Sequence, residues 1–268
     1  MGVGPAARMA WHRLIGYGGG PQIDESLVAY RCLAGQVTPG TMVDVGAHFG
    51  GSLAPFLRAD WRVLAFEPDR RNRAALLSAF GDRPNLTVDA RAVSESCESG
   101  VVLFRSPLST GISGLSRFHS SHRPADLVDT ITLAEALAEH RIRQVDFLKI
   151  DTEGFDLMAL RGIDWHASAP TLVMCEFEDD KTVPLGYNYH DMTAFLAARG
   201  YQIIVSEWHP VKTYGERHQW RGFGCYPYEL GHSSAWGNLL ATRDAELAAR
   251  LQQCLADMAR EIAPAGQA

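Results

Sequence analysis

The stretch Met42-Val43-Asp44-Val45-Gly46-Ala47-His48-Phe49-Gly50-Gly51-Ser52 decides the fold of this chain. It has a short apolar run that includes an acid, followed by glycines, and the residues after Ser52 predict the start of a helix. A strand, a glycine turn and a helix in this order build a ligand pocket at the carboxyl edge of a parallel sheet. The spacing Asp-x-Gly-x-x-x-Gly differs from the dinucleotide pattern Gly-x-Gly-x-x-Gly, so this stretch alone indicates a pocket without identifying its ligand.

Length and composition predict one α/β domain. The chain has 268 residues, 46% of them hydrophobic, which is enough to bury a substantial core. We expect a loose arm over residues 1–22, a single domain over 23–242 with an aromatic insertion at about 207–233, and an amphipathic helix and tail over 243–268. The net charge is −6 and no Lys/Arg cluster is present, which argues against a nucleic-acid partner.

The cysteines and the hydropathy pattern bear on location. The five cysteines lie far apart and form no Cys-x-x-Cys pair, which favours reduced structural thiols over zinc ligands or disulfides. We find no apolar run of signal-peptide or membrane-spanning length. The expectation is a soluble cytoplasmic protein without a membrane span.

Strands and helices alternate along the sequence, which predicts a doubly wound, mostly parallel seven-stranded sheet with helices on both faces. The expected strands include residues 42–45, 62–67, 85–93, 145–151, 171–177, 201–206 and 236–242. A loop without a helix leads into the last of these strands, so we expect that strand to be antiparallel. The polar segment 106–124 is expected to be a long loop that covers a site.

Four acids stand at or near the ends of predicted strands, namely Asp44, Glu67, Asp151 and Glu176. The carboxyl ends of parallel strands meet at one edge of a sheet, so these acids should come together. Glu67 follows Gly46 by 21 residues, close to the spacing at which an acid meets ribose hydroxyls. A single strand-end acid more often caps a helix or faces solvent, but an ordered set behind a glycine turn favours a cofactor site.

Four segments resemble the FkbM-type methyltransferases, a family of the class I S-adenosylmethionine-dependent group: residues 43–50, 66–68, 92–94 and 147–154. The resemblance covers roughly residues 40 to 180, and its most specific part is Lys149-Ile150-Asp151-Thr152-Glu153-Gly154. It implies the Rossmann-like class I methyltransferase fold and S-adenosylmethionine as the cofactor. This chain has His48 where many members have asparagine.

The resemblance also implies a role for individual residues. The implied cofactor site consists of Asp44, Gly46, Ala47, His48, Gly50, Ser52, Glu67, Pro68, Ala92, Val93 and Asp151. Within it, the glycine turn would shape the methionine end, with Ser52 on the carboxylate, and Glu67 would hold the ribose hydroxyls. Ala92 and Val93 would lie along the adenine, and Asp151 would sit beside the methionine amino group or the reacting centre.

Asp151 and Glu176 are the candidate catalytic residues, because an alcohol acceptor must lose its proton to a base or a metal. Together with Glu153 they could also bind Mg²⁺ as hard oxygen ligands. We favour a site without metal, because carboxylates at strand ends need no ion. Histidines on the long loop, His119 and His122, offer alternative bases.

The expected function is therefore S-adenosylmethionine-dependent O-methyl transfer to a sugar hydroxyl, in a glycan or a glycosylated metabolite. One alternative is a methyltransferase acting on a non-sugar natural-product hydroxyl, and another is a non-catalytic scaffold with the same fold. An NAD-dependent oxidoreductase is disfavoured, because the third glycine of its fingerprint is missing. The identity of the acceptor, the base and the possibility of a homo-oligomer stay open.

Overall fold

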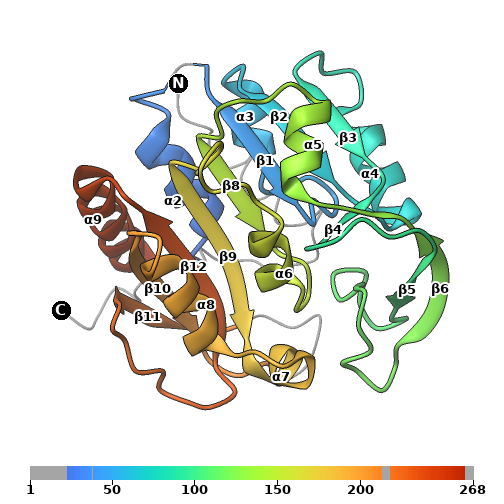
Figure 1. Cartoon of the computed structure of the whole chain (residues 1–268). Helices are drawn as coiled ribbons and strands as arrows, with labels where there is room; N and C mark the ends of the chain where they lie inside the picture. The colour runs from blue at the N-terminus through green and yellow to red at the C-terminus, as the bar shows by residue number, and fades with distance from the viewer. Residues whose placement is uncertain (1–22, 38, 213–217, 263–268) are drawn as a thin grey trace.

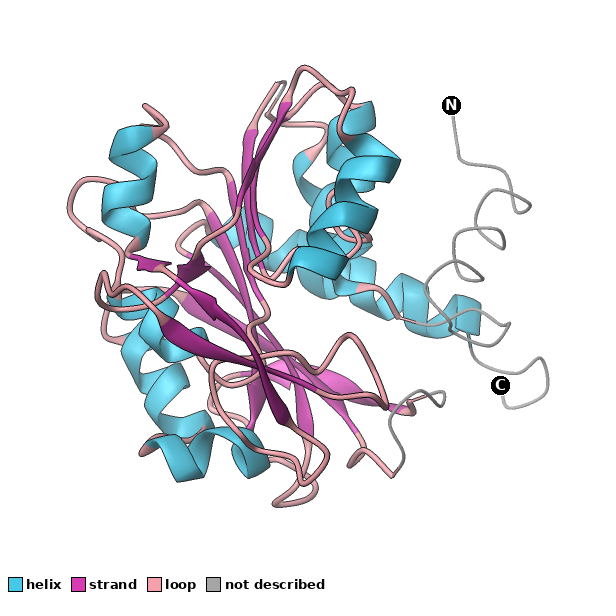
Figure 2. Cartoon of the chain, turned by 90° about the vertical axis from the view of Figure 1, so that its right-hand side faces the viewer, coloured by secondary structure: helices cyan, strands magenta, loops and turns pink. Residues whose placement is uncertain are grey.

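The computed structural model describes residues 23–37, 39–212 and 218–262, in which a central sheet is covered by helices on both faces (Figures 1 and 2). The sheet has eight strands in the order β11-β10-β12-β9-β8-β1-β2-β3. Their bounds are β1 Thr41–Val45, β2 Arg62–Phe66, β3 Leu86–Asp89, β8 Phe147–Ile150, β9 Leu172–Glu178, β10 Gln202–Trp208, β11 Trp220–Cys225 and β12 Trp236–Thr242. The helices are α2 Glu25–Leu33, α3 Ala54–Arg58, α4 Arg70–Phe80, α5 Leu133–Glu139, α6 Asp156–Arg161, α7 Asp179–Thr182, α8 Tyr189–Ala197 and α9 Ala245–Ile262, with a 3₁₀ turn at Val183–Leu185. The expected arm, residues 1–22, lies outside the described residues.

Strand β1 lies in the middle of the parallel part of the sheet. It pairs in parallel with β2 and β8, and these pair in parallel with β3 and β9. Because the strands are parallel, the chain segments that follow β1, β2 and β8 leave the sheet at one edge. The mostly parallel sheet with helices on both faces is confirmed.

The antiparallel part differs from the expectation by one strand. Strand β12 lies between β9 and β10 and is antiparallel to both, as expected for the last strand. Residues 220–225 of the expected insertion form β11, which pairs with β10 at the sheet edge. The sheet therefore has eight strands, because part of the insertion extends it.

The single strand expected over residues 85–93 is wrong, because the chain turns after Asp89. The Asp89 carboxylate accepts a 2.9 Å hydrogen bond from the backbone N–H of Arg91, which closes this turn. The following strand β4, Ala92–Val93, leaves the main sheet and pairs in parallel with β7, Thr130–Ile131. A separate hairpin joins β5, Val101–Arg105, to β6, Arg123–Val128.

Alternating side chains of β1 supply both faces of the core. Val43 and Val45 pack into one buried cluster, and Met42 packs into the cluster on the opposite face. Helix α9 contributes a buried apolar face to the second cluster: Leu247, Leu251, Leu255 and Met258. The amphipathic helix expected within residues 243–268 is therefore present, and its apolar face packs on the domain.

Two further observations concern thiols and membranes. The Cys32 thiol of α2 lies 3.2 Å from the Cys254 thiol of α9, and both are free. Within the described ranges, no helix combines the length and the apolar character that a membrane crossing requires.

Candidate active site

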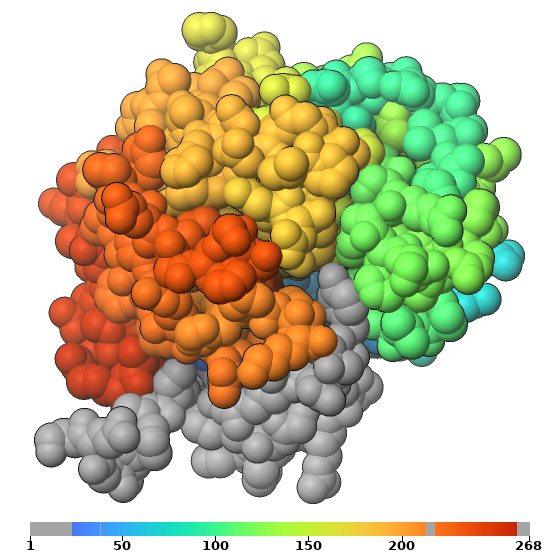
Figure 3. Space-filling model, turned by 90° about the horizontal axis from the view of Figure 1, so that it is seen from below, coloured from blue at the N-terminus to red at the C-terminus, as the bar shows by residue number. Residues whose placement is uncertain are grey.

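A cavity of about 650 Å³ lies at the carboxyl edge of the parallel strands. Figure 3 looks at the molecule from this side, where the gold segment around α7 and the green segment of the long loop border a hollow. Its walls come from the segments after β1, β2 and β8, from β4 and from residues 108–115 of the loop between β5 and β6. This volume is within the range of about 300–1,000 Å³ typical of small-molecule sites.

The glycine turn joins the ends of three strands. Gly46 has a φ of +79°, a backbone conformation that residues other than glycine rarely adopt. The backbone N–H groups of Gly46 and Ala47 both donate to the carbonyl of Phe66, at 3.0 Å each. A Cβ on residue 46 would lie 1.9 Å from the carbonyl oxygen of Asp151. Gly46 and Ala47 line the cavity, so the turn forms part of its wall.

Three of the expected cofactor residues contact protein groups at the turn. Asp44 is fully buried, and its Oδ2 accepts a 2.5 Å hydrogen bond from the Ser52 hydroxyl. Ser52 lines the cavity, but its hydroxyl donates its hydrogen bond to Asp44. Helix α3 begins only at residue 54, so Ser52 is not part of the helix start. A Cβ on Gly50 would lie 2.8 Å from the ring of Phe80, so glycine there allows α4 to pack closely. Asp44 and Gly50 thus support the wall from behind.

Lys149 is a site residue that the sequence analysis did not single out as a contact. Its ammonium is buried and lies 3.3 Å from an oxygen of Asp44 and 3.3 Å from one of Asp151. Burial alone would lower the pKa of Lys149, but these two carboxylates raise it above its ordinary value. A signal was present in the sequence, because residues 149 and 151 are two apart along a strand and a lysine interrupts an apolar run.

Glu67 follows β2 and is buried at the cavity. Its Oε2 accepts a 2.7 Å hydrogen bond from the backbone N–H of His48, and its Oε1 accepts one of 2.8 Å from that of Asp69. Burial raises the pKa of Glu67 to about 8, against the two N–H groups, which lower it. Each oxygen keeps a further lone pair, so the carboxylate still has acceptor capacity for a ligand.

The side chain of His48 is held by neighbours at the same wall. Its backbone has a φ of +50°, its ring stacks on Phe49, and its Nε2 lies 3.0 Å from the hydroxyl of Thr110. Burial lowers the pKa of His48 to about 4, with a further lowering by Lys149. The imidazole is therefore neutral at pH 7 and a weak proton acceptor.

The loop 106–122 covers the cavity, in agreement with the sequence prediction, and Thr110 fastens it. The Thr110 carbonyl accepts hydrogen bonds from Asn72 Nδ2 at 3.2 Å and from the Ser113 hydroxyl at 3.3 Å. Residues 108–115 of this loop line the cavity. Three residues expected in the cofactor site also line it: Pro68, Ala92 and Val93.

Three carboxylates gather where β8 ends, and Asp151 is one of them. We call Asp151, Glu153 and Glu176 the carboxylate cluster, because one oxygen of each lies within 4.8 Å of the others. Burial raises the pKa of Glu153 to about 7 and raises that of Glu176 well above its ordinary value, against the neighbouring Lys181, which lowers both. The sequence prediction that strand-end acids converge is confirmed for this group.

Lys181 of α7 reaches into the carboxylate cluster. Its ammonium lies 2.6 Å from Glu153, 3.1 Å from Glu176 and 2.6 Å from Glu178. Sequence reasoning missed Lys181 and Glu178, although Glu178 is two residues beyond Glu176 on the same strand and so shares its face. Because the ammonium already lies among these oxygens, the donor set fits Mg²⁺ poorly.

Comparison with known families decides the identity of the domain. The sequence model described as "Methyltransferase FkbM domain" matches residues 44–203. The chain belongs to the FkbM methyltransferase family. The matched range of this FkbM domain contains the glycine turn, Glu67 and the carboxylate cluster.

Solved structures similar to this FkbM domain include three methyltransferases. The precorrin-6y C5,15-methyltransferase from Geobacter metallireducens is 10% identical, with 84% of this chain and 93% of that chain covered and a TM-score of 0.41. The C-terminal domain of the Rhodobacter capsulatus precorrin-6Y C5,15-methyltransferase is 14% identical, with 86% and 95% covered and a TM-score of 0.44. The Bacillus cereus O-methyltransferase in complex with SAH is 10% identical, with 88% and 87% covered and a TM-score of 0.41. No curated protein matches significantly.

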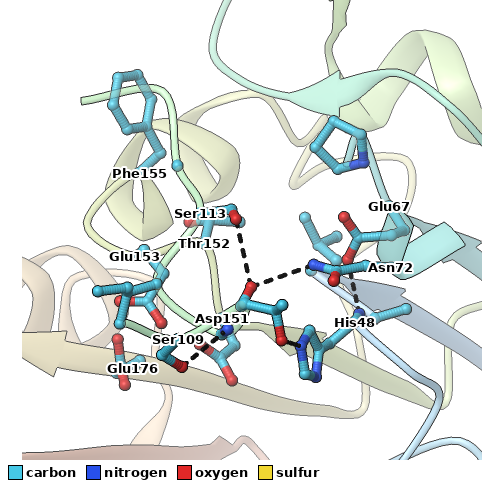
Figure 4. A pocket seen from close by; sticks show the side chains of 18 of the residues that line it. His48, Glu67, Asn72, Ser109, Ser113, Asp151, Thr152, Glu153, Phe155 and Glu176 are labelled. Atoms are coloured by element: carbon cyan, nitrogen blue, oxygen red, sulfur yellow. Dashed lines mark hydrogen bonds between the residues drawn. The ribbon is translucent and has the colours of Figure 1, made fainter. Parts of the chain in front are cut away.

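Figure 4 shows how the cavity of the FkbM domain is arranged. Glu67 and His48 lie on one side, Glu153 and Glu176 lie on the other, and Asp151 lies between them. The structure therefore brings the predicted catalytic residues and all of the predicted cofactor residues except Asp44 and Gly50 into the lining of one cavity.

Proposed function

We propose that this FkbM domain is an S-adenosylmethionine-dependent O-methyltransferase that acts on a sugar hydroxyl, in a glycan or a glycosylated metabolite. One observation carries the proposal: a single cavity joins the glycine turn and Glu67 to the carboxylate cluster. Carboxylates are acceptors for the many hydroxyl donors of a sugar, and the covering loop limits the access of water.

The chain's residues fit the proposed cofactor. Glu67 offers acceptor capacity to ribose hydroxyls, and Pro68, Ala92 and Val93 supply an apolar wall for a purine. Asp151, whose side chain is 40% exposed, offers a negative charge to a cationic amino or sulfonium group. S-adenosylmethionine brings an activated methyl group, so the protein's main task is to position the acceptor oxygen.

Proton removal from the acceptor falls to the carboxylate cluster. As the new O–CH₃ bond forms, the hydroxyl proton passes to a carboxylate, for which we propose Asp151 or Glu176. Asp151 forms an ion pair with Lys149, and Glu176 forms one with Lys181. His48 is disfavoured as the base, because its lowered pKa makes it a weak acceptor. Mg²⁺ is also disfavoured, because Lys181 already supplies the positive charge.

Titration calorimetry with S-adenosylmethionine and S-adenosylhomocysteine tests the cofactor. We expect binding by the wild type and a loss of at least about tenfold in Glu67→Ala, because a buried hydrogen-bond acceptor of the cavity wall is removed. The matched control is Glu246→Ala, whose side chain is 90% exposed on α9 and should bind normally. Absence of binding by the folded wild type would sink the assignment.

Mass spectrometry of reaction products tests the acceptor. Incubation with a panel of glycosides and their aglycones should methylate a sugar hydroxyl. Methyl transfer to aglycone hydroxyls alone would instead identify a non-sugar natural-product enzyme. Release of S-adenosylhomocysteine with any acceptor would exclude a non-catalytic scaffold.

A further inference from the structure

The side-chain amide of Asn72 lies in the wall of the cavity and only one end of it is used by the protein. Asn72 is in the first turns of α4 and is 2% exposed. Its Nδ2 donates to the carbonyl of Thr110 at 3.2 Å. A carbonyl oxygen can only accept, so this contact fixes which end of the amide faces the loop. The Oδ1 atom therefore faces away from Thr110.

The Oδ1 atom of Asn72 receives no hydrogen bond from any residue in the described ranges. A buried amide oxygen without a donor costs free energy, and such groups in native proteins are nearly always satisfied. Asn72 is also one of the residues that line the cavity. A hydrogen-bond donor on a ligand in the cavity would satisfy this atom.

The neighbourhood of Asn72 indicates what kind of donor this is. Figure 4 shows Asn72 beside Glu67, whose carboxyl oxygens also accept hydrogen bonds. Two acceptors side by side suit two neighbouring hydroxyl groups, and they would repel a phosphate or a carboxylate. The chemistry of this part of the wall thus matches a vicinal diol such as that of a ribose.

We propose that Asn72 is a cofactor-binding residue whose Oδ1 accepts a hydrogen bond from a ribose hydroxyl, while its Nδ2 holds the covering loop through Thr110. This inference rests on the proposed function, since it assigns one more contact to the same ligand. It also links two events. A donor on Oδ1 polarises the amide and strengthens the Nδ2 hydrogen bond, so the bound ligand holds the loop more firmly.

Binding of deoxy analogues tests the contact. S-adenosylhomocysteine and its 2′-deoxy and 3′-deoxy analogues are titrated into the wild type and Asn72→Leu. In the wild type, removal of the hydroxyl that meets Oδ1 should weaken binding about five- to tenfold. In Asn72→Leu the parent ligand should bind about five- to tenfold more weakly, and removal of that hydroxyl should cost nothing further. Asn72→Ser provides a smaller replacement for the same cycle.

Hydrogen exchange of the loop tests the link. Ligand should protect the backbone amides of residues 110–115 in the wild type and protect them much less in Asn72→Leu. The matched control for the titrations with deoxy analogues is Ser113→Ala. This variant removes the other donor to the Thr110 carbonyl and leaves Asn72 Oδ1 untouched, so removal of the ligand hydroxyl should weaken its binding as much as in the wild type.

Equal deoxy penalties in the wild type and in both Asn72 variants would overturn the inference and leave the proposed function standing. If the folded wild type does not bind S-adenosylhomocysteine at all, the proposed function is overturned and this inference with it.

Discussion

A Cβ atom on residue 46 would lie 1.9 Å from the carbonyl oxygen of Asp151. The two residues belong to the segments that follow β1 and β8, which are neighbours in the sheet. The site therefore depends on a backbone approach that only glycine permits, in addition to the positive φ of Gly46. The glycine turn and the Asp151 segment can be placed correctly only together.

Gly46→Ala should destabilise the fold by more than about 3 kcal/mol, because the clash is with backbone and the conformation is strained. Urea unfolding followed by circular dichroism measures the loss. The matched control is Gly35→Ala, where an added Cβ meets nothing within 4 Å. A Gly46→Ala protein as stable as this control would contradict the packing of the turn.

Lys149→Met should destabilise the protein by about 3–5 kcal/mol, because it leaves the buried Asp44 carboxylate without its counter-charge. Ser52→Ala removes the other partner of Asp44, a hydrogen bond from an uncharged hydroxyl, and leaves the ammonium in place, so it should cost less, about 1.5–3 kcal/mol. Thermal and urea unfolding of both variants give the comparison. A smaller loss in Lys149→Met than in Ser52→Ala would show that Asp44 does not depend on the ammonium.

His48→Asn should change how stability depends on pH. The pKa of His48 is about 4 in the folded protein and about 6.5 in an unfolded chain, so the unfolded state binds more protons between these values. The contribution of His48 to stability is therefore lost as pH falls from 6.5 to 4. From pH 7 to pH 4 the stability of the variant relative to the wild type should rise by up to about 3 kcal/mol.

The measurement is urea unfolding at both pH values, with His190→Asn as the control. His190 is exposed on α8, whereas His48 is half-buried, so the control removes an imidazole that is already in contact with water. A wild type and a His48→Asn variant that differ equally at pH 7 and pH 4 would contradict a half-buried imidazole that stays neutral.

Removal of divalent metal should leave methyl transfer unchanged within about twofold. The reason is that the Lys181 ammonium lies among the carboxylate oxygens that would otherwise bind Mg²⁺. Initial rates with EDTA and with added Mg²⁺ give the comparison once an acceptor is known. A large loss with EDTA that Mg²⁺ restores would favour the metal set Asp151, Glu153 and Glu176.

Local patterns were sufficient to predict most of the fold. The strand over 236–242 has the predicted bounds, because an apolar run with breakers beside it marks the segment. The split of residues 85–93 was missed. The turn is closed by the hydrogen bond from the backbone N–H of Arg91 to the Asp89 carboxylate, and it contains no glycine or proline that would have marked it. Strand β11 was missed, because it lies in an aromatic insertion without clear alternation.

Contacts between distant segments were the part of the site that the sequence could not supply. Strand ends correctly predicted that Glu67, Asp151 and Glu176 would line one cavity, since parallel topology alone brings them together. Lys181 comes from a four-residue helix, and Asn72 meets Thr110 from 38 positions away. Such pairs depend on how loops fold over the sheet edge, which no short pattern records.

The place of β12 in the sheet has a consequence for biosynthesis. Strand β12 is the last strand along the described chain, yet it pairs on both sides, with β9 and with β10. Until residue 242 has been synthesised and has left the ribosome, β9 has an open edge in an otherwise assembled parallel sheet. The nascent chain therefore carries an exposed apolar strand edge from the emergence of residue 178 until that of residue 242, a stage at which we expect chaperones to bind it.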